Sequence, residues 1–309
     1  TYNGARGGSL NSPGGLAVAS AGATTLLYVA DRGANRVVAH NIAAITNGQD
    51  AGTVLGPFDG GATEPLFDVE CAGDMGAIGM QNPSGIAIDT VRRRLFVGDD
   101  LNYRVLVFDL DTSFKPVNNV ADAVIGQVNL RQCISPQSPT GASFGFVRDL
   151  AIDSDAGRLF VSDSSFRRVL VFDVSAPTLA SGMAATGVLG QVDFTSSVQA
   201  TSQARFNGPQ GLAYDSAQNR LFVSDTGSNR VLTFKVASIT NGQDAGAVIG
   251  QSDFVSSFTG SGATRLFRPE GLAFDPAANR LFVVDRENNR VMVFNVATDV
   301  NGADAGAVF

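Results

Sequence analysis

Short apolar runs of five to seven residues, separated by turn residues, make up most of the chain. In the last unit they are GLAFD, RLFVVD, RVMVFNV and, after a turn at Asn301–Gly302, AGAVF. Apolar runs of this length bounded by Gly, Asn and Asp predict β-strands. In RVLVFDL the alternate positions are apolar on both faces, with Val105 and Val107 on one and Leu106 and Phe108 on the other. A strand that is apolar on both faces is packed on both faces.

A unit of four such strands occurs five times. The residue before the first apolar pair recurs at intervals of 60 to 70 residues, at Gly15, Gly85, Asp149, Gly211 and Gly271. Four-stranded sheets packed on both faces by their neighbours are the blades of a β-propeller, which closes radially. We therefore predict an all-β, five-bladed β-propeller with four antiparallel strands per blade, closed as a ring and forming one domain over 1–309. The blades are expected at about 11–56, 82–127, 146–191, 208–251 and 268–309.

The repeated pattern P-x-G-[LI]-A-x-D…RLFV-x-D…NRV-x-V-F resembles the NHL repeat over nearly the whole chain, and the chain looks similar to secreted bacterial-type NHL proteins. The resemblance implies that GLAFD-type strands line a central channel and AVIGQ-type strands lie outermost. It implies binding of proteins or nucleic acid; some relatives are extracellular sensors, and a few related propellers are metal-dependent lyases or hydrolases. Most NHL propellers have six blades, so a six-bladed ring with one blade outside this chain is the alternative. Blade 1 departs from the pattern at Ala19, where the other blades carry Asp.

The amino-acid composition limits the classes of partner that the chain can bind. The net charge of −7 and the pI of about 4.7 exclude a phosphate-neutralising surface, so we expect no nucleic-acid partner. No stretch approaches the roughly 20 apolar residues that span a bilayer, so no membrane span is expected. Of the 22 basic residues only Lys115 and Lys235 are lysines. Because arginine makes forked hydrogen bonds that a fold can fix, this bias predicts structural arginines. The start at Thr1 predicts a processed or excised chain.

An aspartate is followed five residues later by an arginine in all five units, on either side of the turn between the second and third strands. The pair could form a ligand-binding ring of charges or a turn clamp, in which the carboxylate accepts backbone N–H groups and the guanidinium pairs with it. Because the pair is identical in every blade, we favour the structural clamp. The pairs are Asp31/Arg36, Asp99/Arg104, Asp163/Arg168, Asp225/Arg230 and Asp285/Arg290.

The residues inside that turn vary from blade to blade. Tyr103 and Phe166 place aromatic side chains on successive turns, with Arg167 beside the second, and Arg286 opens the turn of the last blade. Aromatic residues and arginine are enriched at interface hot spots. We take these four as candidate binding residues; the alternative is that the aromatic rings fold back against the long linkers.

The residues just before the inner strand are expected at the channel mouth, where a metal site would lie. Calcium prefers six to eight oxygen ligands. Only Glu270 and the adjacent Asp149 supply carboxylates there, and Arg148 competes with a cation. The single histidine, His40, lies in a third strand, and neither a zinc site nor a Ser-His-Asp triad can be built on it. We predict no catalytic residues, metal or cofactor. The channel-mouth positions are Gly14, Ser84, Arg148, Gln210 and Glu270.

Cys71 and Cys133 occupy comparable points in successive linkers, 14 and 16 residues before their anchors. We expect a disulfide between them, with two free buried thiols as the alternative. A disulfide favours a location outside the cytoplasm.

Three functions follow from these observations. The first is a non-catalytic, extracellular, cell-surface or periplasmic propeller that binds a protein or glycan. The second is a structural subunit that associates with copies of itself in a surface or filament assembly, which the Gly/Ser/Thr-rich linkers of about 20 residues and the low lysine content favour weakly. The third is a metal-dependent lyase or hydrolase.

Overall fold

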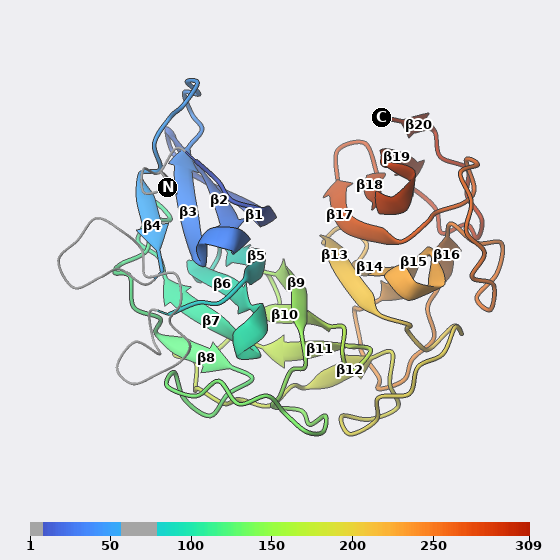
Figure 1. Cartoon of the computed structure of the whole chain (residues 1–309), viewed down its shortest axis with the longest axis horizontal. Helices are drawn as coiled ribbons and strands as arrows, with labels where there is room; N and C mark the ends of the chain where they lie inside the picture. Colours follow the sequence, from blue (N-terminus) through green and yellow to red (C-terminus); the bar gives the residue numbers. More distant parts are fainter. Residues whose placement is uncertain (1–8, 57–78) are drawn as a thin grey trace. The chain divides into compact units, whose positions relative to one another are not determined.

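The computed structural model describes residues 9–56 and 79–309. These residues form five antiparallel sheets of four strands, each in sequence order (Figure 1). The predicted all-β, five-bladed β-propeller fold is confirmed.

Blade 1 comprises β1 (Pro13–Ala21), β2 (Thr24–Asp31), β3 (Arg36–Asn41) and β4 (Thr53–Leu55). Blade 2 comprises β5 (Pro83–Asp89), β6 (Arg94–Asp99), β7 (Arg104–Asp109) and β8 (Ala123–Ile125). Blade 3 comprises β9 (Val147–Asp153), β10 (Arg158–Asp163), β11 (Arg168–Asp173) and β12 (Gly187–Leu189). Blade 4 comprises β13 (Pro209–Asp215), β14 (Arg220–Asp225), β15 (Arg230–Lys235) and β16 (Ala247–Ile249). Blade 5 comprises β17 (Pro269–Asp275), β18 (Arg280–Asp285), β19 (Arg290–Asn295) and β20 (Ala307–Val308).

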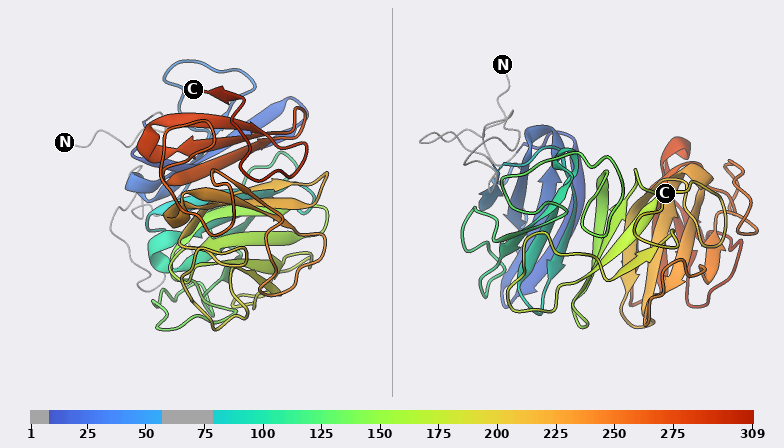
Figure 2. Two further views of the ribbon diagram at one scale, coloured as in Figure 1. Left: turned by 90° about the vertical axis from the view of Figure 1, so that its right-hand side faces the viewer. Right: turned by 90° about the horizontal axis from the view of Figure 1, so that it is seen from below.

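The chain divides into two compact units, each described here by itself. Of the described residues, unit 1 contains 9–56, 79–137, 142–159 and 173–184, and unit 2 contains 138–141, 160–172 and 185–309. Unit 1 therefore holds blades 1 and 2 with strand β9, and unit 2 holds blades 4 and 5 with most of β10 and β11. Within each unit, consecutive sheets stack face to face, as Figure 2 shows for blades 4 and 5.

Stacking explains why the strands are apolar on both faces. The inner strand of one blade lies against the inner strand of the next, β1 against β5 and β13 against β17. Aromatic rings fill the space between blades: Phe222 of β14 packs on Phe274 of β17, with ring centroids 5.6 Å apart. The burial of these large side chains supplies most of the stabilising free energy, as in any propeller core.

The Pro-x-Gly that opens an inner strand forms a β-bulge, because the pairing of β13 with β14 skips from Pro209 to Leu212. The glycine of this motif lies against the backbone of the next blade. A Cβ on Gly211 would collide with the carbonyl oxygen of Glu270. In blade 2 a Cβ on Gly85 would lie 2.5 Å from the Cα of Asp149. The glycine therefore sets how closely two blades approach.

Candidate functional site

The five Asp–Arg pairs form salt bridges within the turns between second and third strands. In blade 4 the Nε of Arg230 lies 2.9 Å from a carboxylate oxygen of Asp225, and both side chains are fully buried. The other carboxylate oxygen accepts the backbone N–H of Asn207, ahead of β13. The remaining Arg230 nitrogens donate to linker carbonyls on both sides of the blade. The other pairs are Asp31–Arg36 at 2.8 Å, Asp99–Arg104 at 2.7 Å, Asp163–Arg168 at 3.0 Å and Asp285–Arg290 at 2.7 Å.

A glutamine after the outermost strand attaches the long linker to the same turn. Gln251 is fully buried, and its Nε2 donates to the carbonyls of Asn229 and Phe258. Its Oε1 accepts the backbone N–H of Phe258. Gln191 makes the equivalent three bonds with Arg167 and Val198, and Gln127 makes them with Tyr103 and Ile134.

The last residue of each turn adopts a left-handed backbone conformation. In three blades it is asparagine, with φ of 51° at Asn35, 53° at Asn229 and 51° at Asn289. Asparagine enters this region at little cost because its side chain bonds locally. The same position holds Tyr103 with φ of 56° and Arg167 with φ of 54°. Bulky residues are strained there, so these two turns carry side chains that their backbone disfavours.

The asparagine of this position also joins neighbouring blades. The Asn229 Oδ1 accepts the backbone N–H of Arg268, directly before β17, at 2.9 Å. In blade 2 the ring of Tyr103 takes over this role. It stacks on Phe146, which precedes β9, with ring centroids 6.1 Å apart. A hydrogen bond between blades is thus replaced by an aromatic contact that is half-buried on both sides.

Arg148 completes a mixed surface around this aromatic pair. Its guanidinium lies over the Phe146 ring at 4.9 Å and donates to Asp100 at 3.0 Å. Leu101, the next residue in the turn, is 40% exposed. We call Leu101, Tyr103, Phe146 and Arg148 the Tyr103 surface. It combines an exposed apolar side chain, stacked rings and a cation in unit 1.

Asp100 lies buried beneath that surface. Its Oδ2 accepts from Arg148 and from the Asn82 amide, whereas its Oδ1 has no hydrogen-bond partner. Burial raises the pKa of Asp100 above its ordinary value, and the guanidinium groups of Arg148 and Arg32 only partly offset this effect. The turn therefore holds a carboxylate that the fold does not fully stabilise.

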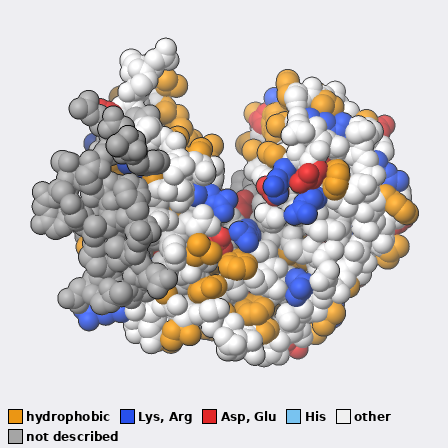
Figure 3. All heavy atoms as spheres, in the orientation of Figure 1, with side chains coloured by type: hydrophobic (Ala, Val, Ile, Leu, Met, Phe, Trp, Pro, Cys, Tyr) orange, Lys and Arg blue, Asp and Glu red, His pale blue; other side chains and the backbone are white. Residues whose placement is uncertain are grey.

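The other predicted binding residues lie in unit 2 and make contacts of a different kind. The ring of Phe166 lies 5.1 Å from the guanidinium carbon of Arg168, so it covers the clamp of its own blade. Arg167 donates to the carbonyls of Ser165 and Ser197. Arg286 pairs with Glu270 at 2.7 Å. Figure 3 shows basic and acidic side chains side by side on the surface of unit 2.

The predicted channel-mouth residues are mostly engaged in structural bonds. The Ser84 hydroxyl is buried and donates to the carbonyl of Val147 at 2.6 Å, which ties blade 2 to β9. Arg148 and Glu270 form the ion pairs described above. His40 lies half-buried on β3. Among the described residues, no three His, Cys, Asp or Glu side chains group as metal ligands.

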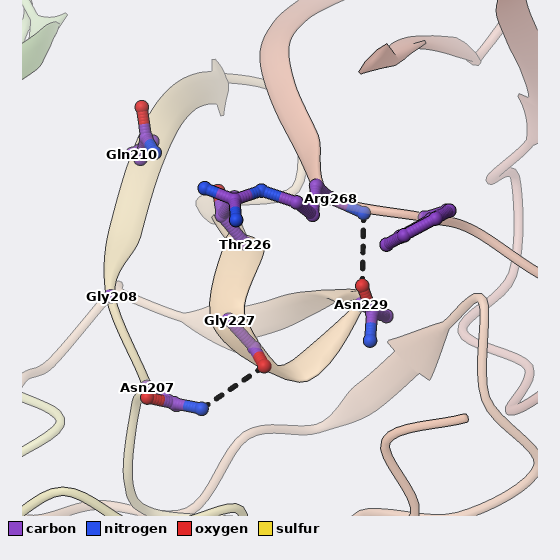
Figure 4. A pocket seen from close by; sticks show the side chains of 8 residues that line it. Asn207, Gly208, Gln210, Thr226, Gly227, Asn229 and Arg268 are labelled. Atoms are coloured by element: carbon purple, nitrogen blue, oxygen red, sulfur yellow. Dashed lines mark hydrogen bonds between the residues drawn. The ribbon is translucent and has the colours of Figure 1, made fainter. Parts of the chain in front are cut away.

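Gln210 instead lines a pocket of about 340 Å³ between blades 4 and 5 (Figure 4). The Arg268 side chain extends across this pocket from the loop before β17 toward Thr226. The pocket floor is made by the blade 4 turn, where Asn207 donates to the carbonyl of Gly227 at 3.0 Å. The lining residues are Asn207, Gly208, Gln210, Thr226, Gly227, Asn229, Phe267 and Arg268.

Sequence reasoning missed Phe146, Arg268 and the buried glutamines. The first two precede an inner strand, and only the stacking of consecutive blades shows that this position meets the preceding turn. The signal for the glutamines was present in the repeated Ile-Gly-Gln, which was assigned to the fourth strand. Cys71 lies outside the described residues, so the Cys71–Cys133 disulfide stays a prediction.

The clamp recurs in all five blades and the inter-blade glycine in all but blade 3, and the family comparison matches two of these blades. The model described as NHL repeat matches residues 206–234 and 268–294, in blades 4 and 5. The chain thus contains NHL repeats in blades 4 and 5. NHL repeat-containing protein 2 from Bos taurus is 26% identical to it over 171 residues, which are 54% of this chain and 21% of that protein. The match thus spans about a fifth of that relative.

A solved structure shares the fold at lower identity. A chain in the crystal structure of a nidogen/laminin complex superposes with a TM-score of 0.56, covering 97% of this chain and 80% of that chain, at 14% identity. At this identity the likeness shows the propeller fold alone. None of the helices among the described residues is long and apolar enough to cross a membrane.

Proposed function

We propose that this NHL-repeat chain is a non-catalytic, extracytoplasmic binding module that takes a protein partner on the Tyr103 surface. The observation that carries the proposal is the left-handed backbone of Tyr103, at a position where three other blades have asparagine. A fold selected for stability alone is served better by asparagine there. The strained tyrosine instead presents a ring stacked on Phe146, next to Arg148 and the exposed Leu101.

The chemistry of this surface suits a protein. Tyrosine and arginine are the residue types that dominate interface hot spots, and a rigid stacked ring loses little conformational entropy on binding. A glycan would also stack on an exposed ring, and it is the competing ligand in the test below. The solved structure with a similar fold is a complex of two proteins, which is in keeping with a protein partner.

The absence of catalysis and the location belong to the same proposal. The channel-mouth side chains of Ser84, Arg148 and Glu270 are held in structural bonds and do not converge on one reacting atom. An extracytoplasmic location is supported by the expected Cys71–Cys133 bond. Mass analysis after alkylation, with and without reductant, tests that bond: two alkylatable thiols in the unreduced chain contradict it.

The test of binding is a comparison of Tyr103→Asn with wild type. The immobilised full chain is used to capture proteins from the extracellular fraction of its source, and each captured protein is then purified and titrated by calorimetry. We expect Tyr103→Asn to weaken the affinity of the true partner at least about tenfold, as loss of a hot-spot aromatic does. Its thermal midpoint should equal or exceed that of Tyr103→Ala, because asparagine relieves the backbone strain.

Ile45→Asn is the control, because Ile45 is 77% exposed in the loop between β3 and β4 of blade 1. This loop lies at the end of its blade opposite to the turn between the second and third strands. The affinity of Ile45→Asn for the captured partner should equal that of wild type. Equal affinity for wild type and Tyr103→Asn contradicts the proposal. Retention of oligosaccharides instead of proteins identifies a glycan-binding module. A captured second copy, with concentration-dependent mass in light scattering, identifies the self-associating subunit. Turnover of a lactone or phosphoester with added calcium or zinc contradicts the non-catalytic function.

A further inference from the structure

The pocket between blades 4 and 5 holds a cation and an amide that the fold does not use. The side chain of Arg268 is 52% exposed, and its Nε lies 3.9 Å from the nearest Glu287 oxygen, beyond hydrogen-bonding distance. The side-chain amide of Gln210 makes no hydrogen bond within the described residues. The other polar groups of the pocket are engaged: Thr226 donates to the carbonyl of Pro269, and the Asn229 amide donates to that of Ser257.

The corresponding junctions in unit 1 show what normally fills this space. Between blades 1 and 2 the side chain of Arg32 donates to the amide oxygen of Asn82 at 3.2 Å. Between blade 2 and β9 the guanidinium of Arg148 pairs with Asp100. In both junctions a charged side chain is joined to a partner from the neighbouring blade. Between blades 4 and 5 the cation is present, but among the described residues no side chain of blade 4 pairs with it, and its ionic contact, at 3.9 Å, is with Glu287 of its own blade.

The local acidic groups do not supply that partner. Glu270 is bound by Arg286 at 2.7 Å, and Glu287 lies equally far from Arg286 and Arg268, at 3.9 Å. The terminal nitrogens of Arg268 are thus left to the pocket. Together with the Gln210 amide, they offer hydrogen-bond donors to a planar anionic group, and an arginine fork matches a carboxylate in two parallel bonds.

We propose that this pocket binds a carboxylate carried by a peptide segment of a protein partner, with Arg268 as the ionic partner and Gln210 as a hydrogen-bond donor. A volume of about 340 Å³ fits one side chain or one chain end. The site lies wholly in unit 2 and stands independently of the Tyr103 surface.

A peptide is favoured over an acidic polysaccharide by charge. The chain carries a net charge of −7, so a polyuronate with a carboxylate on every sugar is repelled by the protein as a whole. A peptide with a single carboxylate brings one negative charge to Arg268 and little repulsion elsewhere. The pocket is also bounded by the backbone of Gly208, where none of the described atoms lies within 4 Å of an added Cβ, so another main chain can approach there.

The test is a titration of the full chain followed by the ¹H–¹⁵N signals of the arginine and glutamine side chains. The probes are acetyl-Gly-Glu-Gly-amide, acetyl-Gly-Gly-Gly with a free carboxylate, the neutral acetyl-Gly-Gln-Gly-amide, and glucuronate. We expect saturable shifts of the Arg268 and Gln210 signals with one of the two acidic peptides, which then identifies a side-chain or a chain-end carboxylate. The neutral peptide should cause none.

Arg268→Asn and Gln210→Ala are the test variants. Asparagine is compatible with the backbone at this position, because Asn82 occupies it in blade 2 with φ of 57°, close to the 53° of Arg268. We expect Arg268→Asn to weaken binding at least about tenfold and Gln210→Ala by less. Arg280→Gln is the control: Arg280 is 50% exposed and lies at the other end of β18, paired with Asp275.

Three results overturn the proposal. The first is the absence of saturable shifts with either acidic peptide. The second is an equal loss of affinity in Arg268→Asn and Arg280→Gln, which indicates a general effect of charge. The third is binding of glucuronate without binding of either acidic peptide. Because this readout uses only unit 2, failure of the Tyr103 test leaves it unaffected.

Discussion

Single residues in this chain divide into those that every blade repeats and those that differ between blades. Arg230 is a repeated residue: it joins Asp225 to linker carbonyls on both sides of its blade and is fully buried. Tyr103 differs from its counterparts and is strained and half-exposed. Repetition thus marks residues that hold the fold, and a departure from it marks residues whose presence the fold does not explain.

Arg230→Ala should lower the free energy of unfolding by about 3 kcal/mol or more, because it leaves the buried Asp225 carboxylate without its partner. Arg280→Ala is the matched control, since the Arg280–Asp275 pair is solvent-exposed and should contribute far less to stability. Urea denaturation of both variants measures the difference. Similar losses in the two would show that burial of the clamp has no effect on its contribution.

Asp100 gives a pH dependence of defined sign. Its pKa is raised by burial in the folded state, so the folded protein holds this proton at a pH where the unfolded chain, with a pKa of about 3.9, has released it. The native state then binds more protons than the unfolded state, and this contribution to stability grows as the pH falls. Wild type should therefore gain stability relative to Asp100→Asn as the pH falls from 7 toward the unfolded pKa of about 3.9. A relative loss over that range, measured by urea midpoints at constant ionic strength, would show that Arg148 outweighs burial.

At the scale of elements, the strands were predictable and their junctions were not. Short, nearly continuous apolar runs bounded by turn residues identify the strands, because both faces of each sheet are buried. The contact of Tyr103 with Phe146 joins a turn of one blade to the start of the next. The two residues are 43 positions apart in the sequence, so no local sequence pattern predicts the contact. The Asp–Arg clamp could be predicted from the sequence only because an identical pair recurs five times.

The linkers that follow blades 2, 3 and 4 are each held by one glutamine, which makes them testable elements. Gln251→Leu should cost about 2 kcal/mol, because it removes four hydrogen bonds: three with backbone groups of Asn229 and Phe258 and one from the Arg265 side chain. Amide exchange should quicken in the linker that follows β16 and stay slow in β14. Gln218→Leu, at an exposed position in the turn before β14, is expected to be neutral. Unchanged exchange in the linker would contradict the role assigned to Gln251.

For the whole molecule, the repeat predicts more than the fold class. Four of the five inner strands, all except β9, open with the same Pro-x-Gly motif, and in blades 2 and 4 its glycine is required by the backbone of the blade that follows. Blade 5 has this glycine too, at Gly271. Among the described residues, an added Cβ there would contact only Val284 of the same blade, at 3.4 Å. The sequence thus provides blade 5 with a face shaped to receive another blade, as the predicted closed ring requires.

Closure of the ring can be tested at that glycine. If another blade packs on blade 5 as blade 5 packs on blade 4, Gly271→Ala must be as damaging as Gly211→Ala, whose Cβ would collide with the Glu270 carbonyl. Forced overpacking of this kind costs about 1–3 kcal/mol. Gly262→Ala is the control, because nothing lies within 4 Å of its added Cβ. Thermal or urea unfolding of the three variants measures the loss of stability in each. The strands that hold Gly211 and Gly271 carry the same motif, so a difference between these two variants reports whether another blade covers the glycine. If Gly211→Ala is destabilised and Gly271→Ala behaves like Gly262→Ala, blade 5 keeps an open face in solution and the predicted closure is wrong.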